Sequence, residues 1–352
     1  MRIALAWLDP SDPTDAAVAR GHGRALKALG HQPVLVGPRR SGRGEGTVFG
    51  LRFVTASSAS GVAALQRRFR FDLWHCHVFG RSHAPLTEAL RLHRWPSVAS
   101  LHLVLPDYLA AAGGRPGLGA LLRQVRHTTA VSAWSLGEAV RLWPFLKERS
   151  SVVACGLAED WMVPGKVPVG HGARPFIFCA ARQAPYKGLD VLLMAFAKLR
   201  EMRKDLRLVI AGRDQMKGAL PAFARRLGLG LSVSFAGELP AGRVRRLMAE
   251  SLFFVLPSRR EPLGLALMEA MALGKACATS RTGGITELAV HGRHALLAPP
   301  GDVKALAGAM ERLTLEPDLR ERLGTAARQR AGLFTWGRAA AAFERIYGCV
   351  LR

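Results

Sequence analysis

Short, continuous apolar runs alternate with longer segments of helical periodicity along most of this 352-residue chain. Residues 2–8 form such a run, residues 16–29 have the periodicity of a helix, and residues 32–36 form the next run. Runs that are apolar throughout, rather than at alternate positions, are typical of parallel strands buried on both faces. The order strand, helix, strand predicts a parallel sheet and therefore an α/β fold.

The same alternation continues through the rest of the chain. Further apolar runs predict strands at 71–77, 97–102, 128–132, 151–154, 175–180, 206–211, 232–236, 252–256 and 276–279, and an α-helical region is expected to begin at 296–302. Helices are predicted at 60–70, 118–126, 135–143, 189–199, 243–250 and 265–273, and a last one starts after Thr335, which suits an N-cap. The chain is longer than most domains that have a single hydrophobic core, so we expect two α/β domains.

A segment rich in proline and glycine, 163–174, separates the two sets of predicted strands and is typical of a linker. We therefore expect an N-terminal domain at 1–165, a C-terminal domain at 166–335 and a terminal helix at 336–352. A second segment, 38–46, is rich in glycine and arginine and predicts a mobile loop within the first domain.

Composition narrows the class of protein and its partners. Apolar residues make up 49% of the chain, which is enough for two packed cores and excludes wholesale disorder. The formal net charge is +24, so the surface should attract anions such as nucleotide diphosphates, phosphorylated glycolipids or an anionic membrane. Nucleic acid is not an expected partner, because basic residues are not interleaved with aromatic ones and no known binding module is recognised.

The five cysteines are scattered through the chain without a metal-binding or redox spacing. We expect them to be mostly buried and reduced, in a cytoplasmic protein. The apolar stretch at the N-terminus is too short for a signal peptide, and an acidic residue follows it too closely. No apolar run reaches the roughly 20 residues of a membrane span. The helix at 60–70 has a basic face that could contact a membrane surface, although a solvated face is the commoner explanation.

The strand at 252–256 and the loop and helix after it carry the most informative residues. Ligands of open parallel sheets bind beyond the carboxyl ends of the strands, where this loop lies. Glu261 and Glu269 frame the segment, and their spacing is too long for a retaining glycosidase pair, whose carboxyl groups lie about 5–5.5 Å apart. The spacing suits two ends of one elongated ligand, with two unrelated surface carboxylates as the alternative.

The string around these two residues, Pro-Ser-x-x-Glu-Pro-x-Gly followed by Glu-Ala-Met-Ala-x-Gly, resembles the signature of retaining glycosyltransferases with the GT-B fold, most closely family 4, the group 1 type. The resemblance implies that Glu261 contacts the donor sugar near its anomeric carbon and the diphosphate. It implies that Glu269 holds the ribose hydroxyls of the nucleotide. The resemblance covers nearly the whole chain and is strongest over 175–340.

The segment after the strand at 175–180 has a second motif. Arg182 and Lys187 stand between a strand end and a helix N-terminus, which favours an anion site because Arg can hold two phosphate oxygens while Lys adds a point charge. The segment resembles the family's Gly-Arg-x4-Lys-Gly element, with Ala181 in place of the first glycine. The resemblance implies that both cations stabilise the departing diphosphate.

The resemblance also implies further donor contacts at the ends of neighbouring strands. Glycines are needed where a ligand approaches the backbone or where φ is positive, and two other loops would cradle the nucleobase. The predicted donor-binding residues, in addition to Glu269, are Gly212, Glu238, Leu239, Gly264, Leu265, Gly283 and Gly284.

In the first half of the chain the candidates are histidines at strand ends. His75 and His77 lie at positions i and i+2 of one strand and therefore share a face, and His102 follows the next strand. Both strand ends resemble family motifs, which implies that His102 faces the donor sugar and that His77 lies on the acceptor side. A structural role is the alternative for each histidine. A zinc site is not expected, because no third ligand is suggested.

The loop after the first strand departs from the family pattern. The family usually carries a Gly-Gly pair there, whereas this chain has Asp9, Asp12 and Asp15 among prolines. Carboxylates would repel an approaching phosphate. Either the acceptor is bound differently, or Asp12 and Asp15 hold the hydroxyl groups of a polyol acceptor, and capping of the following helix by Asp12 or Thr14 is the alternative.

The resemblance implies two doubly wound, Rossmann-like domains that face each other across a cleft, with the terminal helix crossing back to the first domain. The expected activity is transfer of a sugar, with retention of anomeric configuration, from a nucleoside diphosphate sugar, UDP- or GDP-linked, to a glycan or glycolipid acceptor. Neither a cofactor nor a metal is expected. The alternatives are another GT-B enzyme, such as a phosphorylase or an epimerase, and a catalytically silent scaffold.

The basic surface favours an anionic acceptor, as in polysaccharide or lipopolysaccharide biosynthesis. Such an acceptor would bring a cytoplasmic enzyme into peripheral contact with the inner membrane surface. We expect a monomer or a weak oligomer.

Overall fold

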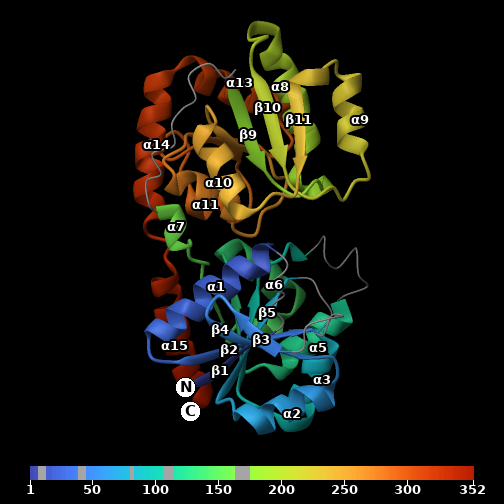
Figure 1. The fold of residues 1–352 in the computed structure, drawn as a ribbon, viewed down its shortest axis with the longest axis vertical. Coiled ribbons are helices and arrows are strands. Elements are labelled where there is room, and N and C mark those ends of the chain that lie inside the picture. The colour runs from blue at the N-terminus through green and yellow to red at the C-terminus, as the bar shows by residue number, and fades with distance from the viewer. Residues whose placement is uncertain (7–12, 39–44, 80–82, 106–114, 163–174) are drawn as a thin grey trace. The chain divides into compact units, whose positions relative to one another are not determined.

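The computed structural model describes the chain except for residues 7–12, 39–44, 80–82, 106–114 and 163–174 (Figure 1). The chain divides into two compact units. Unit 1 comprises residues 1–158 and 334–352, and unit 2 comprises residues 159–333. The predicted boundary between residues 165 and 166 falls outside the described residues.

Unit 1 contains one sheet whose strand order is β3-β4-β2-β1-β5-β6-β7-β8. All neighbouring pairs are parallel except β3 and β4. The predicted parallel sheet is therefore confirmed, and an antiparallel hairpin extends its edge. The strands are β1 (Arg2–Ala6), β2 (Gln32–Pro38), β3 (Glu45–Val48), β4 (Leu51–Ala56), β5 (Leu73–Val78), β6 (Ser97–Leu101), β7 (His127–Ala130) and β8 (Ser150–Val152).

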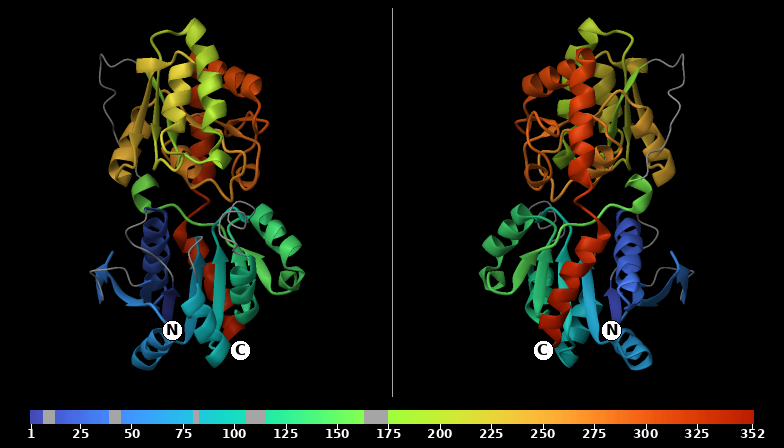
Figure 2. Two further views of the ribbon diagram at one scale, coloured as in Figure 1. Left: turned by 90° about the vertical axis from the view of Figure 1, so that its right-hand side faces the viewer. Right: turned by 90° about the vertical axis from the view of Figure 1, so that its left-hand side faces the viewer.

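Helices cover both faces of this sheet (Figures 1 and 2). One face carries α1 and α15, which lie side by side, and the other carries α2, α3 and α5 over a core of buried aliphatic side chains. Thr335 caps α15 as predicted, because its side chain accepts a hydrogen bond from the Arg338 amide. The helices are α1 (Pro13–Ala28), α2 (Ala59–Phe69), α3 (Ala84–His93), α5 (Arg115–Gln124), α6 (Ala133–Leu142), η1 (Pro144–Leu146) and α15 (Trp336–Leu351).

A close approach between α1 and the start of α15 explains one glycine of the first helix. A Cβ atom at Gly21 would lie 2.0 Å from Trp336 Nε1, so only glycine lets the indole ring pack against α1 at this point. The segment 334–352, remote in sequence, is in this way packed into unit 1.

Unit 2 contains a wholly parallel sheet with the order β11-β10-β9-β12-β13-β14. Helices α8 and α13 pack together on one face, and α10 and α11 lie on the other (Figure 1). Two doubly wound α/β units confirm the predicted fold class. The strands are β9 (Phe176–Ala180), β10 (Arg207–Ala211), β11 (Val233–Gly237), β12 (Phe254–Leu256), β13 (Cys277–Ser280) and β14 (Leu296–Ala298).

The helices of unit 2 follow the predicted order, with additional helices at its two ends and after β9, β10 and β13. Leu273 is the C-cap of α11, and Gly274 follows it with φ of 70°, the conformation that ends a helix. The helices are α7 (Glu159–Met162), η2 (Pro185–Lys187), α8 (Leu189–Met202), α9 (Ala219–Arg226), η3 (Gly230–Ser232), α10 (Ala241–Glu250), α11 (Leu265–Ala272), α12 (Ile285–Leu288), α13 (Val303–Leu315) and α14 (Pro317–Ala331).

The predicted loop at 38–46 is wrong at both of its ends. Pro38 belongs to β2, and β3 begins at Glu45, while residues 39–44 lie outside the described residues. Strand β3 pairs with β4 through a two-residue turn, Phe49 and Gly50, with φ of 57° and 74°. Positive φ at both central residues matches the twist of a hairpin. Neither strand of this hairpin was predicted, and β3 is polar and exposed and lacks an apolar run.

Candidate functional site

The candidate donor site of unit 2 is built from loops that follow neighbouring strands at the carboxyl edge of the sheet. The loop after β9 is joined to the loop after β12, because the Arg259 amide donates to the Tyr186 carbonyl at 2.8 Å. The loop after β13 joins the same group through the Gly284 amide, which donates to the Glu261 carbonyl at 2.9 Å. Three loops from separate strands thus form one hydrogen-bonded surface.

Lys187 and Glu261, predicted as separate ligands of the donor, form an ion pair. Lys187 Nζ lies 2.6 Å from Glu261 Oε2, and the side chains are only 13% and 8% exposed. The Ser258 hydroxyl donates to the same carboxylate oxygen at 2.9 Å and is fully buried. One carboxylate oxygen of Glu261 thus accepts from two donors, and one of these is a charged ammonium.

A second ion pair holds the same loop against helix α8. Arg259 donates from both terminal nitrogens to the Asp190 carboxylate, each at 2.7 Å. The Arg259 guanidinium lowers the pKa of Asp190 through these hydrogen bonds. Sequence reasoning missed both residues, although Arg259 lies within the Pro-Ser-x-x-Glu motif.

Glu269 is in a different environment from Glu261. It lies in the second turn of α11, is partly exposed, and has no hydrogen-bond or ion-pair partner among the described residues. Burial raises the pKa of this carboxyl to about 8, because the surrounding protein desolvates the charged form. Glu269 therefore retains its full capacity for external hydrogen-bond donors or acceptors.

Arg182 follows β9 and is exposed, with no partner among the described residues. The neighbouring Gln183 turns inward, where its Nε2 donates to the Gly212 carbonyl at 3.2 Å. The predicted residues Arg182 and Gly212 are thus adjacent at the ends of paired strands, and Arg182 offers an unpaired cation there.

The other predicted donor residues lie at the same edge of the sheet. Glu238 follows β11 and is exposed, with its carboxylate bound by Arg213 Nε at 2.9 Å, and Leu239 is partly exposed. Gly264 is the N-cap of α11 with φ of 100°, and Leu265 is the first residue of that helix.

Gly283 and Gly284 are explained by packing between loops. A Cβ at Gly283 would lie 2.1 Å from the Glu261 carbonyl oxygen, and one at Gly284 would lie 2.2 Å from the Pro262 carbonyl oxygen. Such contacts are far below any allowed separation. The glycine pair therefore lets the loop after β13 support the backbone of Glu261 directly.

In unit 1 the candidate residue His102 lies at the carboxyl end of β6, and both of its ring nitrogens have partners. Nε2 lies 3.0 Å from His77 Nδ1, and Nδ1 lies 3.5 Å from Cys155 Sγ. Burial lowers the pKa of His102 to about 3, so the ring is neutral near pH 7. The structure therefore brings together His77 and His102, two of the predicted residues, and adds Cys155.

The face shared by His75 and His77 points at α1 and α15. His77 Nε2 lies 3.3 Å from His22 Nδ1, and His75 Nδ1 lies 2.6 Å from the Tyr347 hydroxyl. Burial lowers the pKa of His22 to about 3 and those of His75 and His77 well below the ordinary value. Sequence reasoning missed His22 and Tyr347 at this place, because their helices are remote from β5 along the chain.

His22 also overturns the reason for which a zinc site was not expected. The ligand atoms of His22, His75 and His77 lie within 4.8 Å of one another, so a third histidine does accompany the pair. All three histidines also take part in hydrogen bonds through their ring nitrogens.

Asp12 and Asp15 were predicted to hold an acceptor. Asp12 lies outside the described residues, and Asp15 lies in α1 at a position whose side chain is not described. Capping of α1 by Asp12 or Thr14 stays a prediction.

Two family profiles match this chain over consecutive segments. The profile of glycosyl transferases group 1 matches residues 168–330, and that of glycosyltransferase family 4 matches residues 16–161. The chain belongs to the group 1 glycosyltransferases. The enzyme class expected from the resemblance is thereby confirmed.

Among characterised relatives, this glycosyltransferase is 28% identical to a glycogen synthase of Mycobacterium tuberculosis over 299 residues, which is 80% of the chain and 69% of the relative. It is 31% identical to a D-inositol 3-phosphate glycosyltransferase of Corynebacterium diphtheriae over 229 residues, 60% of the chain and 53% of that relative. The relatives thus differ among themselves in the activity for which they are named.

Solved structures confirm the GT-B fold of the glycosyltransferase. The sucrose-phosphate synthase of Thermosynechococcus elongatus superposes with a TM-score of 0.83 at 19% identity, over 99% of each chain. HepE of Anabaena, solved in complex with UDP and glucose, gives a TM-score of 0.82 at 18% identity, over 99% of this chain and 100% of that one.

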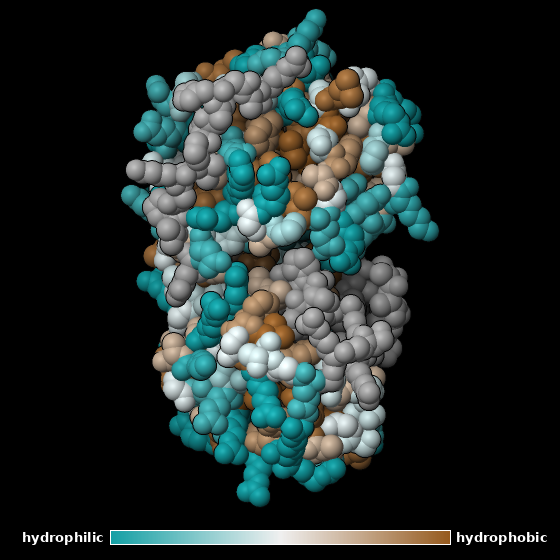
Figure 3. Space-filling model, viewed as in Figure 1, coloured by the Kyte–Doolittle hydropathy of each residue, from teal (hydrophilic) through white to brown (hydrophobic). Residues whose placement is uncertain are grey.

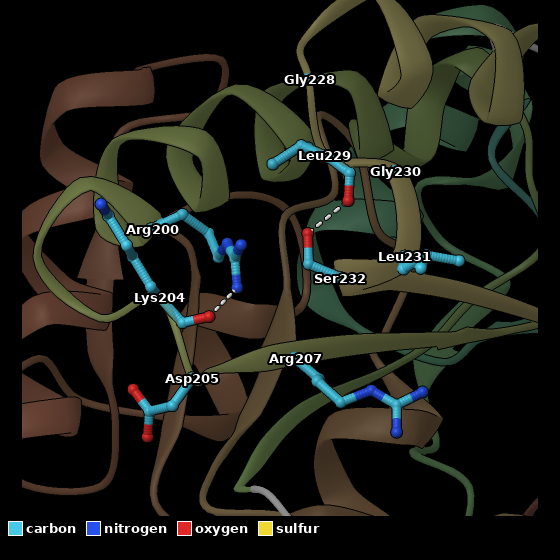
Figure 4. A pocket seen from close by; sticks show the side chains of 9 residues that line it. All are labelled: Arg200, Lys204, Asp205, Arg207, Gly228, Leu229, Gly230, Leu231 and Ser232. Carbon is cyan, nitrogen blue, oxygen red and sulfur yellow. Dashed lines mark hydrogen bonds between the residues drawn. The ribbon is translucent and has the colours of Figure 1, made fainter.

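A groove of about 570 Å³ lies at the opposite edge of the unit 2 sheet, before β10 and β11, and is separate from the candidate donor site (Figure 4). Its basic lining includes Arg207, and Arg200 donates to the Lys204 carbonyl across it.

Hydrophilic side chains cover much of the face seen in Figure 3. Among the described residues, no helix combines the length and hydropathy that a bilayer crossing requires.

Proposed function

We propose that this glycosyltransferase moves a sugar, with retention of anomeric configuration, from a nucleoside diphosphate sugar to a glycan or glycolipid acceptor. The observation that carries the proposal is the set of side chains at one sheet edge of unit 2: an unpaired exposed arginine, a lysine–glutamate pair and an unpaired, partly buried glutamate. The arginine suits a diphosphate, the lysine–glutamate pair suits a developing charge at the anomeric centre, and the unpaired glutamate suits a ribose.

Arg182 is assigned to the diphosphate, because its guanidinium is exposed and pairs with no carboxylate in the part of the chain that the structure describes. Lys187 would share its charge between Glu261 and the departing phosphate oxygens. Glu269 would accept hydrogen bonds from the two ribose hydroxyls. Since such donors favour the charged form of a carboxyl, donor binding should release the proton that burial keeps on Glu269 at neutral pH.

The proposed chemistry uses no protein nucleophile. Glu261 is held by Lys187 and Ser258, so it is placed to stabilise positive charge on the sugar rather than to attack it. The bond between the anomeric carbon and the diphosphate oxygen breaks, and the acceptor oxygen bonds to that carbon on the same face. The acceptor proton passes to the departing phosphate oxygen, which leaves the anomeric configuration unchanged.

UDP and GDP are the proposed nucleotides. A structural neighbour was solved with UDP and glucose, and a relative from Mycolicibacterium smegmatis is named for GDP-mannose. An anionic acceptor is proposed from the net charge of +24. If the acceptor is anionic, its KM should rise with ionic strength, and transfer to a neutral soluble sugar that salt does not affect would contradict this assignment.

The test is calorimetric titration with UDP, GDP and ADP, repeated on Arg182→Ala and on the matched control Arg207→Ala. Arg207 is also exposed, but it lies at the opposite edge of the sheet. We expect one nucleotide to bind, the Arg182 variant to lose at least tenfold in affinity, and the control to bind normally. Equal losses in both variants would point to general charge attraction and contradict the assigned site.

Retention is tested separately by proton NMR of the first product formed. An α-linked donor should give an α-linked product before any spontaneous anomerisation. An inverted product would exclude the same-face mechanism. Turnover with free phosphate, or conversion of the donor without an acceptor, would instead identify a phosphorylase or an epimerase.

A further inference from the structure

Eight buried or partly buried polar groups of unit 1 form one unbroken hydrogen-bonded chain. It begins at Thr129 on β7, crosses to α15 and α1, and ends at Cys155 beyond β8. The successive donor–acceptor pairs and their distances are Thr129 Oγ1 and Ser100 Oγ (2.5 Å), Ser100 Oγ and His75 Nε2 (2.6 Å), His75 Nδ1 and Tyr347 Oη (2.6 Å), Tyr347 Oη and His22 Nε2 (3.4 Å), His22 Nδ1 and His77 Nε2 (3.3 Å), His77 Nδ1 and His102 Nε2 (3.0 Å), and His102 Nδ1 and Cys155 Sγ (3.5 Å).

Each of the four histidines in this hydrogen-bonded chain uses both ring nitrogens, one toward each neighbour. A neutral imidazole carries a proton on one nitrogen and a lone pair on the other. Each ring must therefore donate on one side and accept on the other, and each choice fixes the next. Only two states keep all links: the four rings are all protonated at Nδ1, or all protonated at Nε2.

The two end groups decide between these states. With all rings protonated at Nδ1, the Thr129 hydroxyl donates to Ser100 and the unused proton is that of the Cys155 thiol. With all rings protonated at Nε2, the thiol donates and the hydroxyl proton of Thr129, which is 1% exposed, has no acceptor among the described residues. A buried hydroxyl without an acceptor costs more than an unused thiol, which is a weak donor.

We infer that this chain commits His102 to the Nδ1-protonated tautomer, so that His22, His77 and Tyr347 are positioning residues for His102. The consequence is that the Nδ1–H group of His102 is a hydrogen-bond donor whose acceptor is the sulfur of Cys155, a weak acceptor. A hydroxyl or phosphate oxygen of a substrate is a better acceptor than a thiol and would replace it. This last step rests on the proposed role of His102 in the transferase reaction.

The same geometry argues against a metal among His22, His75 and His77. Their ring nitrogens already serve the chain, and a divalent cation would have to break its links and bring two positive charges into a buried site. The four neutral rings need neither a counterion nor water.

The test is a two-bond proton–nitrogen NMR correlation on protein labelled with nitrogen-15 in histidine. In the wild-type protein, the rings of His22, His75, His77 and His102 should all show the Nδ1-protonated pattern. A single ring of the four in the other tautomer would overturn the inference, as would zinc-dependent shifts confined to the first three rings.

An exchange of the end groups provides the perturbation. The double variant Thr129→Cys with Cys155→Ser places the hydroxyl end group at the His102 end and the thiol at the other end, so all four rings should change to the Nε2-protonated pattern together. In the single variant Cys155→Ser both end groups are hydroxyls, so each of the four rings should show a mixture of the two patterns. Cys349→Ser, an exposed site on α15, is the control and should change none. Rings that respond independently would overturn the inference.

Activity separates this inference from the proposed function. If His102 donates to a substrate, the exchange variant should raise the KM of that substrate about tenfold, while Cys349→Ser leaves it unchanged. If the predicted tautomers are found but His102→Ala changes neither KM nor kcat, the chain is established and the substrate contact of His102 is wrong.

Discussion

Lys187 Nζ lies 2.6 Å from Glu261 Oε2, and this contact joins the loop after β9 to the loop after β12. Two residues that the family motifs present as separate ligands are one buried ion pair. Their charges largely cancel before any donor arrives, which leaves Arg182 as the unpaired cation of the three predicted residues. The pair is therefore both part of the loop structure and part of the proposed chemistry.

Lys187→Met should destabilise unit 2 by about 3 kcal/mol, because it leaves the Glu261 carboxylate buried without its cation. The free energy of unfolding in urea measures this loss. Lys198→Met, an exposed lysine on α8, is the control and should change stability by less than about 0.5 kcal/mol.

The double variant Lys187→Met with Glu261→Gln separates stability from activity. Removing both charges should restore most of the lost stability, since no unpaired charge remains. Transfer activity should stay at least about a hundredfold below wild type, because the charge that stabilises the leaving diphosphate is absent. Recovery of activity along with stability would show that the pair is structural only.

Glu269 predicts a loss of stability as the solution becomes alkaline. Its folded pKa, about 8, is above the ordinary 4.5, so the folded protein binds the extra proton and stability falls as pH rises between these values. Glu269→Gln cannot ionise and should be more stable than wild type at pH 8.5, by roughly 1–2 kcal/mol once partial exposure is allowed for.

The gap between Glu269→Gln and wild type should close by pH 5, where the wild-type carboxyl is protonated in the folded state. Urea midpoints at the two pH values measure it. Glu321→Gln, which removes an exposed carboxyl on α14, is the control, and its stability should change with pH as that of the wild type does. Parallel curves for Glu269→Gln as well would mean that burial does not hold the proton on this carboxyl.

The donor loops could be predicted from sequence because their information is local. Glu261, Gly264 and Glu269 belong to one strand, loop and helix, and the apolar run before them fixes their place at the sheet edge. The partner of Glu261 could not be predicted in this way. Lys187 and Arg259 bind carboxylates that are distant in sequence, Glu261 in a loop and Asp190 on α8, and only tertiary packing brings them together.

The histidine chain predicts a loss of stability in acid, the opposite dependence from that of Glu269. The folded pKa values of His22 and His102 are about 3, below the ordinary 6.5, so the unfolded chain binds protons that the folded one does not. Stability is therefore present above pH 6.5 and is lost as pH falls below it, by about 1.4 kcal/mol per histidine and pH unit.

His75→Gln should reduce this slope by about one proton, whatever its effect on stability at neutral pH. The slope of the unfolding free energy between pH 6 and 5 is the measurement. His93→Gln, at an exposed position in α3, is the control and should leave the slope unchanged. A slope as steep in His75→Gln as in wild type would show that His75 is protonated in the folded state.

This chain also marks the limit of sequence reasoning in unit 1. The strand at 71–77 correctly predicted that His75 and His77 share a face, since strand geometry alone determines it. What covers that face depends on α1 and α15, whose residues His22 and Tyr347 come from opposite ends of the chain. Tertiary packing, rather than any motif, turns separate histidines into one network.

Gly283→Ala should cost far more stability than Gly292→Ala, although both glycines have positive φ, 51° and 73°. The conformation alone costs an alanine about 1 kcal/mol at either position. At Gly292 the new Cβ meets nothing within 4 Å, whereas at Gly283 it would lie 2.1 Å from the Glu261 carbonyl oxygen. We expect about 1 kcal/mol for Gly292→Ala and at least about 2 kcal/mol more for Gly283→Ala, measured by urea unfolding. Because the displaced backbone carries Glu261, Gly283→Ala should also lower kcat, and equal effects of the two substitutions would contradict the support of Glu261 by this loop.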